Sequence, residues 1–184
     1  MRRGLPRRGA PTYRSVMSEA VAPELAQVNL ARLKFPLDSP ELKDFVDQLD
    51  PVNADADTAD GFVWRLQSEG GDATDIPVFG DEWLIVNMSV WRDLESLKGF
   101  MYAGRHRQLL ARRREWFERV AEAMVALWWV PAGHRPTVAE AEARLLHLRT
   151  HGPSPYAFTF RTLFPPQGAR PLPGEVPEGL GCSV

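Results

Sequence analysis

The chain has 184 residues, of which 44% are hydrophobic and 25% are charged, and its formal net charge is −2. A chain of this length and composition suits one globular domain with a sizeable core. The overall charge gives no basic signal for nucleic acid, and no segment approaches the roughly 18 apolar residues that span a bilayer. We therefore expect neither a nucleic-acid partner nor a membrane partner.

Both ends of the chain differ in composition from its body. Residues 1–16 hold five arginines and no acidic residue, and no apolar run follows them as it would in a signal peptide. We predict a disordered basic head at 1–21, a folded domain at 22–166 and a disordered, Gly/Pro-rich tail at 167–184. The single cysteine, Cys182, lies in that tail and cannot form an internal disulfide, which fits a reducing cytoplasm.

The first half of the body predicts two strands separated by a helical segment. Residues 24–35 alternate between apolar and polar side chains, as a strand does. Pro40 suits the first position of a helix, Pro51 then interrupts the helical spacing, and residues 53–60 are either helical or a loop. A second strand is predicted at 61–67.

The middle of the chain predicts a loop, a strand and a long helix. Residues 68–80 are rich in Gly, Asp and Pro, and residues 82–91 give the clearest strand pattern in the chain. Asp93 caps the next helix, which is interrupted near Gly104 and continues over 105–120.

The last part of the body predicts a strand at 124–130, a helix at 137–148 and a short strand at 157–164. Thr137 followed three residues later by Glu140 is the pattern of a capping box. The first six elements then have the order β-α-β-β-α-β, the ferredoxin-like arrangement of an α+β fold. It places helices on one face of an antiparallel sheet and leaves the other face to be covered by something else.

Side chains alternate along a strand, so the two faces of the sheet can be separated. In the strand at 82–91 one face is an aliphatic row suited to pack on helices: Leu84, Val86, Met88 and Val90. The other face mixes aromatic, aliphatic and polar side chains: Trp83, Ile85, Asn87, Ser89 and Trp91. The first strand repeats this asymmetry, with Gln27 and Asn29 on one side.

Buried polar groups need hydrogen-bond partners, and ligand pockets combine a few such groups with aromatic walls. We therefore predict a ligand cavity on the polar face, and the ordinary alternative is a half-exposed face with scattered aromatic residues. The predicted substrate-binding residues are Gln27, Asn29, Trp64, Trp83, Asn87, Ser89, Trp91 and Trp128. The expected ligand is a small hydrophobic or aromatic metabolite.

Two histidines and an arginine are the candidates for catalysis. His106 lies in the predicted long helix, with Arg113 or Arg114 two turns further on, so a general base and an oxyanion-binding guanidinium can share a face. Arg114 is the predicted catalytic arginine. The alternative is a surface histidine in a basic stretch. His134 lies in a turn between a strand and a helix, where it either acts on a ligand or caps a carbonyl.

The sequence patterns of nucleotide enzymes, zinc enzymes and α/β-hydrolases are missing. There is no Gly-rich phosphate loop, no Gly-x-Ser-x-Gly elbow and no zinc spacing. His147 and His151 are four residues apart, as in a helical metal pair, but no third ligand follows at a suitable spacing. We therefore expect no metal site and no cofactor.

Several separated motifs resemble, in order, an uncharacterised bacterial family, domain of unknown function 3291. They are Leu25-Ala26-Gln27-Val28-Asn29, Gly61-Phe62-Val63-Trp64-Arg65-Leu66, Trp116-Phe117, Leu127-Trp128-Trp129-Val130-Pro131-Ala132-Gly133-His134, Pro136-Thr137, Glu140-Ala141 and Phe158-Thr159-Phe160. The resemblance covers about residues 24–164 and implies the dimeric α+β barrel superfamily, in which two ferredoxin-like domains face their sheets together. It implies a homodimer, and it carries no catalytic residue over.

That superfamily includes cofactor-free antibiotic-biosynthesis monooxygenases, muconolactone isomerases, stress-response barrel proteins and haem-handling enzymes. The leading hypothesis is a small-molecule enzyme resembling cofactor-independent monooxygenases, acting on an aromatic or polyketide-like metabolite. Such substrates react with oxygen once deprotonated, so the protein need only bind, desolvate and take a proton. The alternatives are an isomerase or cyclase working by acid–base chemistry, a non-catalytic ligand-binding or stress-response barrel, and a haem-binding barrel.

Overall fold

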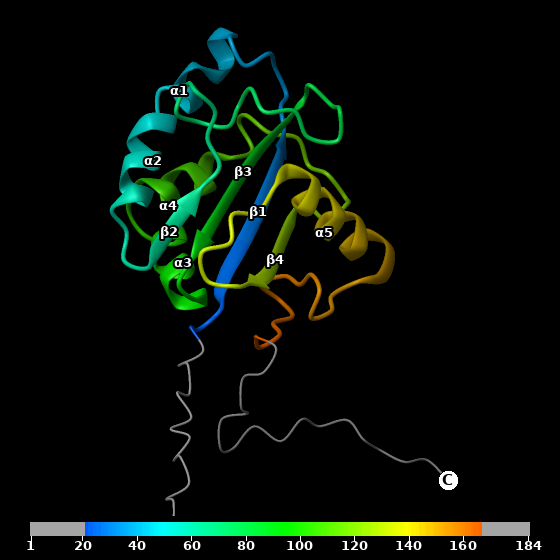
Figure 1. Ribbon diagram of the computed structural model, residues 1–184. Coiled ribbons are helices and arrows are strands. Elements are labelled where there is room, and N and C mark those ends of the chain that lie inside the picture. The colour runs from blue at the N-terminus through cyan, green and yellow to red at the C-terminus, as the bar shows by residue number, and fades with distance from the viewer. Residues whose placement is uncertain (1–20, 167–184) are drawn as a thin grey trace, which may run out of the picture.

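The computed structural model describes residues 21–166 of the chain (Figure 1). The predicted head and tail fall, apart from Val21, on residues 1–20 and 167–184 and so lie outside the described residues, as does Cys182. The described part is an α+β structure built on an antiparallel sheet. No helix within it has the length and hydrophobicity of a bilayer-spanning helix.

The sheet contains four strands in the order β2-β3-β1-β4, and every neighbouring pair is antiparallel (Figure 1). The strands are β1 (Glu24–Arg32), β2 (Phe62–Arg65), β3 (Leu84–Trp91) and β4 (Val125–Val130). In the register of β1 with β3, Asn29 lies opposite Asn87 and Gln27 lies opposite Ser89. Directly opposed residues share a face, so these four side chains form one polar patch on the two central strands.

Helical segments fill the two crossovers and follow the last strand. Between β1 and β2 lie the 3-10 turn η1 (Pro40–Leu42), α1 (Lys43–Val46) and α2 (Leu49–Asp57). Between β3 and β4 lie α3 (Leu94–Met101) and α4 (Gly104–Arg112), and α5 (Val138–His151) comes after β4. The predicted caps are confirmed, because Asp93 accepts the Ser96 backbone N–H and Thr137 accepts that of Glu140.

The predicted helix at 105–120 is too long, because α4 ends at Arg112. Beyond that point the backbone pairs with the segment that follows β1, where the Lys34 N–H donates to the Trp116 carbonyl at 3.0 Å. The Trp116 side chain is only 2% exposed. Sheet-like pairing and burial of a large indole therefore replace the last helical turns.

Both outer edges of the sheet are irregular. The pairing of β2 with β3 shifts register between Phe62 and Trp64. At the other edge, Phe158 pairs with Leu127 of β4 through two backbone hydrogen bonds of 2.8 and 2.9 Å. The strand predicted at 157–164 is reduced to such isolated bridges, because the chain turns back on itself after Phe158.

The aliphatic face of the sheet packs beneath α5 and the loop at 68–80. At the centre of this face Val28 is fully buried and Met88 is 1% exposed. Both belong to one apolar cluster with residues of α5 and of the loop, which are Ala141, Leu145, Leu148, Ala73 and Val78. The aliphatic row therefore packs against a helix, as its sequence predicts.

The opposite face packs beneath the crossover helices, but only at its two ends. One apolar cluster contains Trp91 of β3 together with Leu97 of α3. A second cluster contains Phe45 of α1 together with Trp116. The polar patch lies between these two clusters. Burial on this face is therefore interrupted in the middle of the sheet.

Helices thus lie on both faces of the sheet. Figure 1 shows α2, α3 and α4 gathered toward the β2 side and α5 beside β4. The expectation that helices occupy one face and leave the other open is wrong. The crossover helices lie on the polar face and not on the aliphatic one. The aliphatic face is covered by α5, which follows the six elements in ferredoxin order and folds back onto it.

Neighbouring leucines of α5 test whether this helix covers the sheet. Leu145 is 0% exposed and Leu146 is 51% exposed. We expect Leu145→Ala to lower the free energy of unfolding by about 2–5 kcal/mol, because it leaves a cavity in the core. The control Leu146→Ala should change it by less than about 0.5 kcal/mol. Equally small losses in urea unfolding of the two variants would show that α5 does not cover this face.

Candidate ligand cavity

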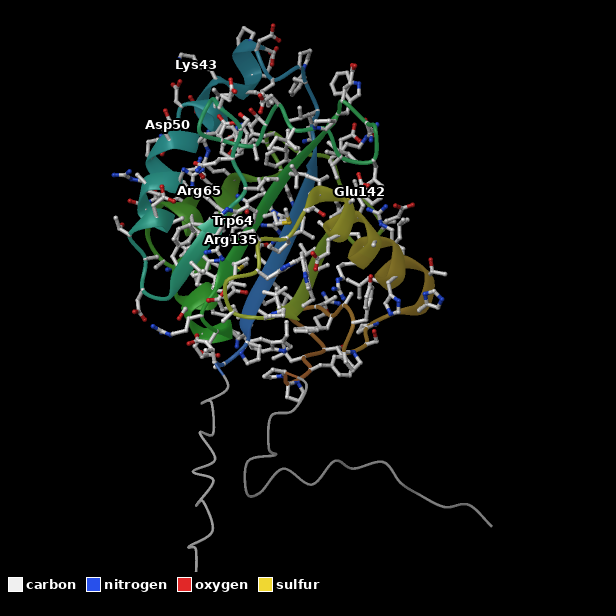
Figure 2. The ribbon with its side chains drawn as sticks, in the orientation of Figure 1. Lys43, Asp50, Trp64, Arg65, Arg135 and Glu142 are labelled. Carbon is white, nitrogen blue, oxygen red and sulfur yellow. The ribbon has the colours of Figure 1, made fainter. Side chains whose placement is uncertain are left out.

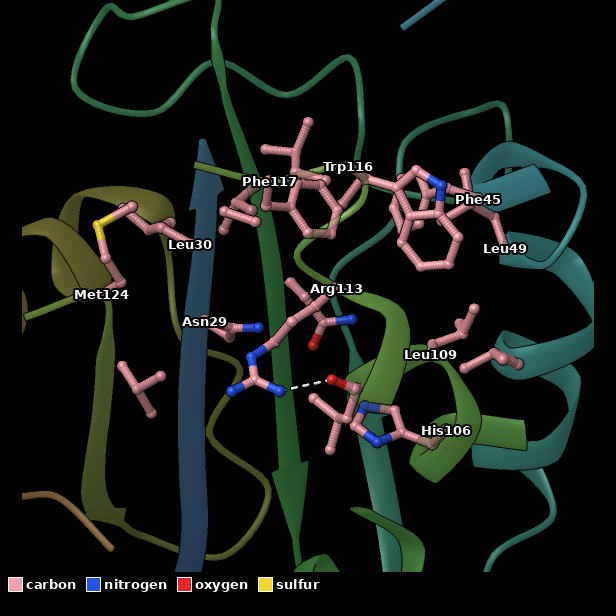
Figure 3. A pocket seen from close by; sticks show the side chains of 18 of the residues that line it. Asn29, Leu30, Phe45, Leu49, His106, Leu109, Arg113, Trp116, Phe117 and Met124 are labelled. Atoms are coloured by element: carbon pink, nitrogen blue, oxygen red, sulfur yellow. Dashed lines mark hydrogen bonds between the residues drawn. The ribbon is translucent and has the colours of Figure 1, made fainter. Parts of the chain in front are cut away.

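Asn29 and Asn87 are exposed although they lie on the two central strands. Their side chains face a cavity of about 580 Å³ between the sheet and the helical crossovers (Figure 3). Pockets that hold small molecules usually measure about 300–1,000 Å³. The middle of the polar patch is therefore the floor of a cavity of suitable size for a metabolite.

A chain of hydrogen bonds fixes the orientation of the Asn87 amide. The indole N–H of Trp91 donates to Ser89 Oγ at 2.8 Å. Gln27 Nε2 donates to Ser89 Oγ at 3.0 Å and to Asn87 Oδ1 at 2.9 Å. Gln27 and Ser89 are each 7% exposed, so they chiefly position Asn87. Because its Oδ1 accepts from Gln27, the Nδ2 group of Asn87 is the end of the amide left for the cavity.

The walls of the cavity are largely apolar. They come from α1, α2, α4, the segment after α4 and the sheet, and they include Phe45, Leu49, Ile85, Leu109, Trp116 and Phe117. Figure 3 shows the residues from the helices and from the segment after α4 facing the sheet across the cavity. A ligand in this space would bury an apolar body against the walls and meet amide groups only at the floor.

His106 reaches the cavity from α4 and also lines a second hollow of about 650 Å³ at the junction of α3 and α4. Its Nδ1 donates to the Met101 carbonyl oxygen at 3.0 Å, since a carbonyl can only accept. In the neutral imidazole Nε2 therefore carries the lone pair. The ring lies 4.8 Å from that of Phe100, which stacks on Trp91 at 5.2 Å.

Burial favours the neutral form of His106. Desolvation lowers the pKa of the imidazole below its ordinary value, and the hydrogen bond to Met101 opposes this only in part. A neutral imidazole with a free lone pair can accept a proton. The direction of this pKa shift thus suits a general base.

The charges around the cavity are predominantly positive. Five arginines and two acidic residues line it: Arg32, Arg65, Arg113, Arg114, Arg119, Asp72 and Glu118. Arg113, the residue after α4, donates from Nη1 to the Leu110 carbonyl at 2.5 Å (Figure 3). No carboxylate within the described residues lies within 4.0 Å of its guanidinium nitrogens.

Two of the predicted tryptophans lie on the far face of the sheet. Trp128 is fully buried there, and its indole N–H donates to Glu140 at 2.8 Å. Trp64 packs against the same apolar cluster, while its neighbour Arg65 lines the cavity (Figure 2 labels both on β2). The adjacent pair thus divides between the two faces, as alternation along a strand requires.

The other two predicted tryptophans do not line the cavity either. Trp83 precedes β3 and is 42% exposed. Trp91 is 1% exposed and packs between the rings of Phe62 and Phe100. The expectation that these four tryptophans line the cavity is therefore corrected, and the wall instead contains Trp116. The structure brings Gln27, Asn29 and Asn87 together at the cavity, places Ser89 just beneath them, and uses the four tryptophans elsewhere.

Of the three predicted catalytic residues, His106 and Arg114 line the cavity and His134 does not. His134 lies in the turn between β4 and α5, where its Nε2 is 2.8 Å from Glu140 Oε2. Burial raises the pKa of Glu140, but hydrogen bonds from His134 and other neighbours outweigh this and lower it. His134 therefore links a turn to a helix, on the opposite side of the sheet from the cavity.

The apolar wall residues were missed by sequence reasoning. Helical spacing does mark Phe45 and Leu109 as buried positions. Spacing along one helix does not tell which other segment a side chain meets, so it gives no sign that these two residues enclose one space.

Of the comparisons with known proteins, the match to a family is the informative one. A family profile described as "Domain of unknown function (DUF3291)" matches residues 24–172. The sequence has no match among curated proteins. Three solved structures are distantly similar, each over 62% of this chain. They are PA3566 from Pseudomonas aeruginosa (11% identity, 98% of that chain, TM-score 0.42), the NE2512 protein of unknown function from Nitrosomonas europaea (13% identity, 94% of that chain, TM-score 0.39) and Rv0793 from Mycobacterium tuberculosis (14% identity, 99% of that chain, TM-score 0.39).

The lowered pKa of His106 predicts a pH dependence of stability. The unfolded chain binds the His106 proton at a higher pH than the folded chain does, so His106 lowers the free energy of unfolding as the pH falls below about 6.5. Above that pH it has no such effect. We expect His106→Gln to flatten the decline in unfolding free energy between about pH 7 and pH 5.

This prediction is checked by urea unfolding at a series of pH values, together with an NMR titration of the imidazole. The His106 signal is assigned by its absence from the spectrum of His106→Gln. A titration midpoint at or above the ordinary value, or the same pH slope in both proteins, would contradict it.

Proposed function

Since the chain belongs to the family described as "Domain of unknown function (DUF3291)", we propose its function from the geometry of the cavity. The chain is a small-molecule enzyme that holds an aromatic or polyketide-like metabolite there and works without a cofactor. Its chemistry resembles that of cofactor-independent monooxygenases. The first step is removal of a proton from the bound ligand.

The observation that supports this proposal is the pair of asparagines at the cavity floor. Asn29 and Asn87 lie side by side on central strands, in positions where a protein core normally places apolar residues. The Asn29 side chain makes no hydrogen bond within the described residues, and the Nδ2 group of Asn87 is left for the cavity. Amide groups held this way among apolar walls are suited to orient a carbonyl or hydroxyl of a ligand.

His106 is the group that supports an enzyme over a passive binding protein. It lines the same cavity, is held in one orientation by the Met101 carbonyl, and has a pKa lowered by burial. A phenol or enol that loses a proton becomes an electron-rich anion, which reacts with dioxygen without a bound cofactor. An isomerase or cyclase begins with the same proton transfer and is the second candidate.

We further propose that the strands and their crossovers form a ferredoxin-like unit. The strand order β2-β3-β1-β4 and the two helical crossovers support this assignment. A barrel made from two copies needs an uncovered sheet face, whereas α5 covers the aliphatic face within one chain. The proposed ligand site is therefore complete in a single chain, and a homodimer would have to form through another surface.

The proton-transfer step can be tested before the natural reaction is identified. Aromatic β-diketones and anthrones are incubated with the protein in D₂O, and exchange of their acidic C–H protons is followed by NMR. We expect the protein to accelerate exchange for at least one compound. His106→Gln should reduce that acceleration by about 100-fold or more, because a positioned general base contributes at least this much.

Arg107 supplies the matched control for this experiment. It lies on α4 next to His106, is exposed, and is not part of the cavity lining. Arg107→Gln should leave the exchange rates unchanged. Acceleration that survives in His106→Gln would remove His106 as the base, and a complete lack of acceleration across the panel would count against proton abstraction.

A further inference from the structure

We infer that the ligand of the cavity carries an acidic group and binds as its anion against Arg113. This inference rests on the proposed function, because it assigns the charge of the molecule that the cavity holds. The chemical class is an apolar, mainly aromatic compound that bears one carboxylate besides the phenol or enol whose proton His106 removes.

The charge of the cavity is opposite in sign to that of the whole chain. The chain has a formal net charge of −2, whereas five arginines and only two acidic residues line the cavity. Low-dielectric walls concentrate the field of the charges inside a cleft. The cavity is therefore an attractive site for an anion on a protein that is weakly anionic as a whole.

Two of these arginines are already neutralised by ion pairs. Arg32 contacts Asp81 at 2.6 Å and Glu118 at 3.4 Å. Arg65 contacts Asp57 at 2.8 Å. Both residues therefore stabilise the rim of the cavity and have little charge left for a ligand.

Arg113 is held in place without being neutralised. Its bond to the Leu110 carbonyl uses one of the five N–H donors of a guanidinium and brings no negative charge. Figure 3 shows this side chain extending from the end of α4 toward Asn29. A planar guanidinium presents paired donors to carboxylate oxygens, and such charge-assisted hydrogen bonds are the strong ones.

The surroundings of Arg113 place the rest of the ligand. An oxyanion at the guanidinium lies on the Asn29 side of the cavity, where the free amide can bind a second oxygen. The body of the ligand then extends toward the apolar side chains of Leu109 and Phe45. This arrangement favours an amphipathic acid over either a neutral hydrocarbon or a highly charged metabolite.

Two fluorescent probes share one aromatic frame and differ in charge, so comparing their affinities separates the effect of the charge from the effect of the shape. 8-Anilino-1-naphthalenesulfonate carries an anionic group, and N-phenyl-1-naphthylamine is the same frame without it. Both become brighter when they leave water for an apolar site. In titrations of the full chain we expect saturable binding of both, with the sulfonate bound more tightly.

Arg113→Met retains an apolar stem and removes the charge. It should weaken binding of the sulfonate probe by about ten-fold, the lower end of what a charged hydrogen bond contributes, and change binding of the neutral probe by less than about two-fold. Arg107→Met on the same helix is the control and should change neither. Equal weakening of both probes by Arg113→Met, or no weakening of either, overturns the inference.

Failure of the proposed cavity gives a different result. Leu109→Trp fills the cavity from α4, and Asn29→Phe fills it from the floor. The variant that circular dichroism shows to be folded is used to test whether the probes bind in the cavity. Either should abolish binding of both probes. If both probes bind such a variant as they bind the wild-type chain, they lie elsewhere and the ligand cavity itself is refuted, whatever Arg113→Met does.

Discussion

The polar patch on β1 and β3 is the constraint on which the rest of the site depends. Apolar clusters around Trp91 and Trp116 bury the two ends of the same sheet face. Between them lie amide and hydroxyl groups, and packing an apolar helix face directly onto these groups would remove them from water without giving them hydrogen bonds. The crossover helices therefore contact the sheet at its ends and leave the cavity over its middle.

The hydrogen bonds within the patch stabilise this arrangement. Ser89 Oγ accepts from both Trp91 and Gln27, so the deepest polar groups find partners inside the protein. Satisfied groups of this kind add little cost to folding, whereas unsatisfied ones destabilise it. Only the outermost amides, those of Asn29 and Asn87, remain available to another molecule.

Much of the fold could be predicted from local patterns. Alternation in the strand at 82–91 identified the two faces of β3, and the caps at Asp93 and Thr137 located the starts of two helices. The placement of α5 could not be predicted, because an amphipathic helix shows which of its sides is buried but not against which layer it packs. The early end of α4 likewise depends on a distant partner, the segment after β1.

The residues at the floor of the cavity could be predicted from the sequence, whereas the residues of its walls could not. Gln27, Asn29 and Asn87 stand out because polar residues interrupt otherwise apolar strands. The tryptophans were misplaced because hydrophobicity does not distinguish a ring that lines a cavity from one that fills a core. Trp128 illustrates this, since only the pairing of β4 with β1 sets which face it shares.

The irregular sheet edges also determine how this protein can meet others. Exposed, regular edge strands recruit further strands from neighbouring molecules and so lead to swapping or fibrils. Here the shift between Phe62 and Trp64 distorts one border, and Phe158 occupies backbone groups along the other. Within the described residues, assembly by extending the sheet is thus discouraged on both sides. For the part of the chain that the structure describes, side-chain surfaces are therefore better suited to association between copies than shared backbone ladders.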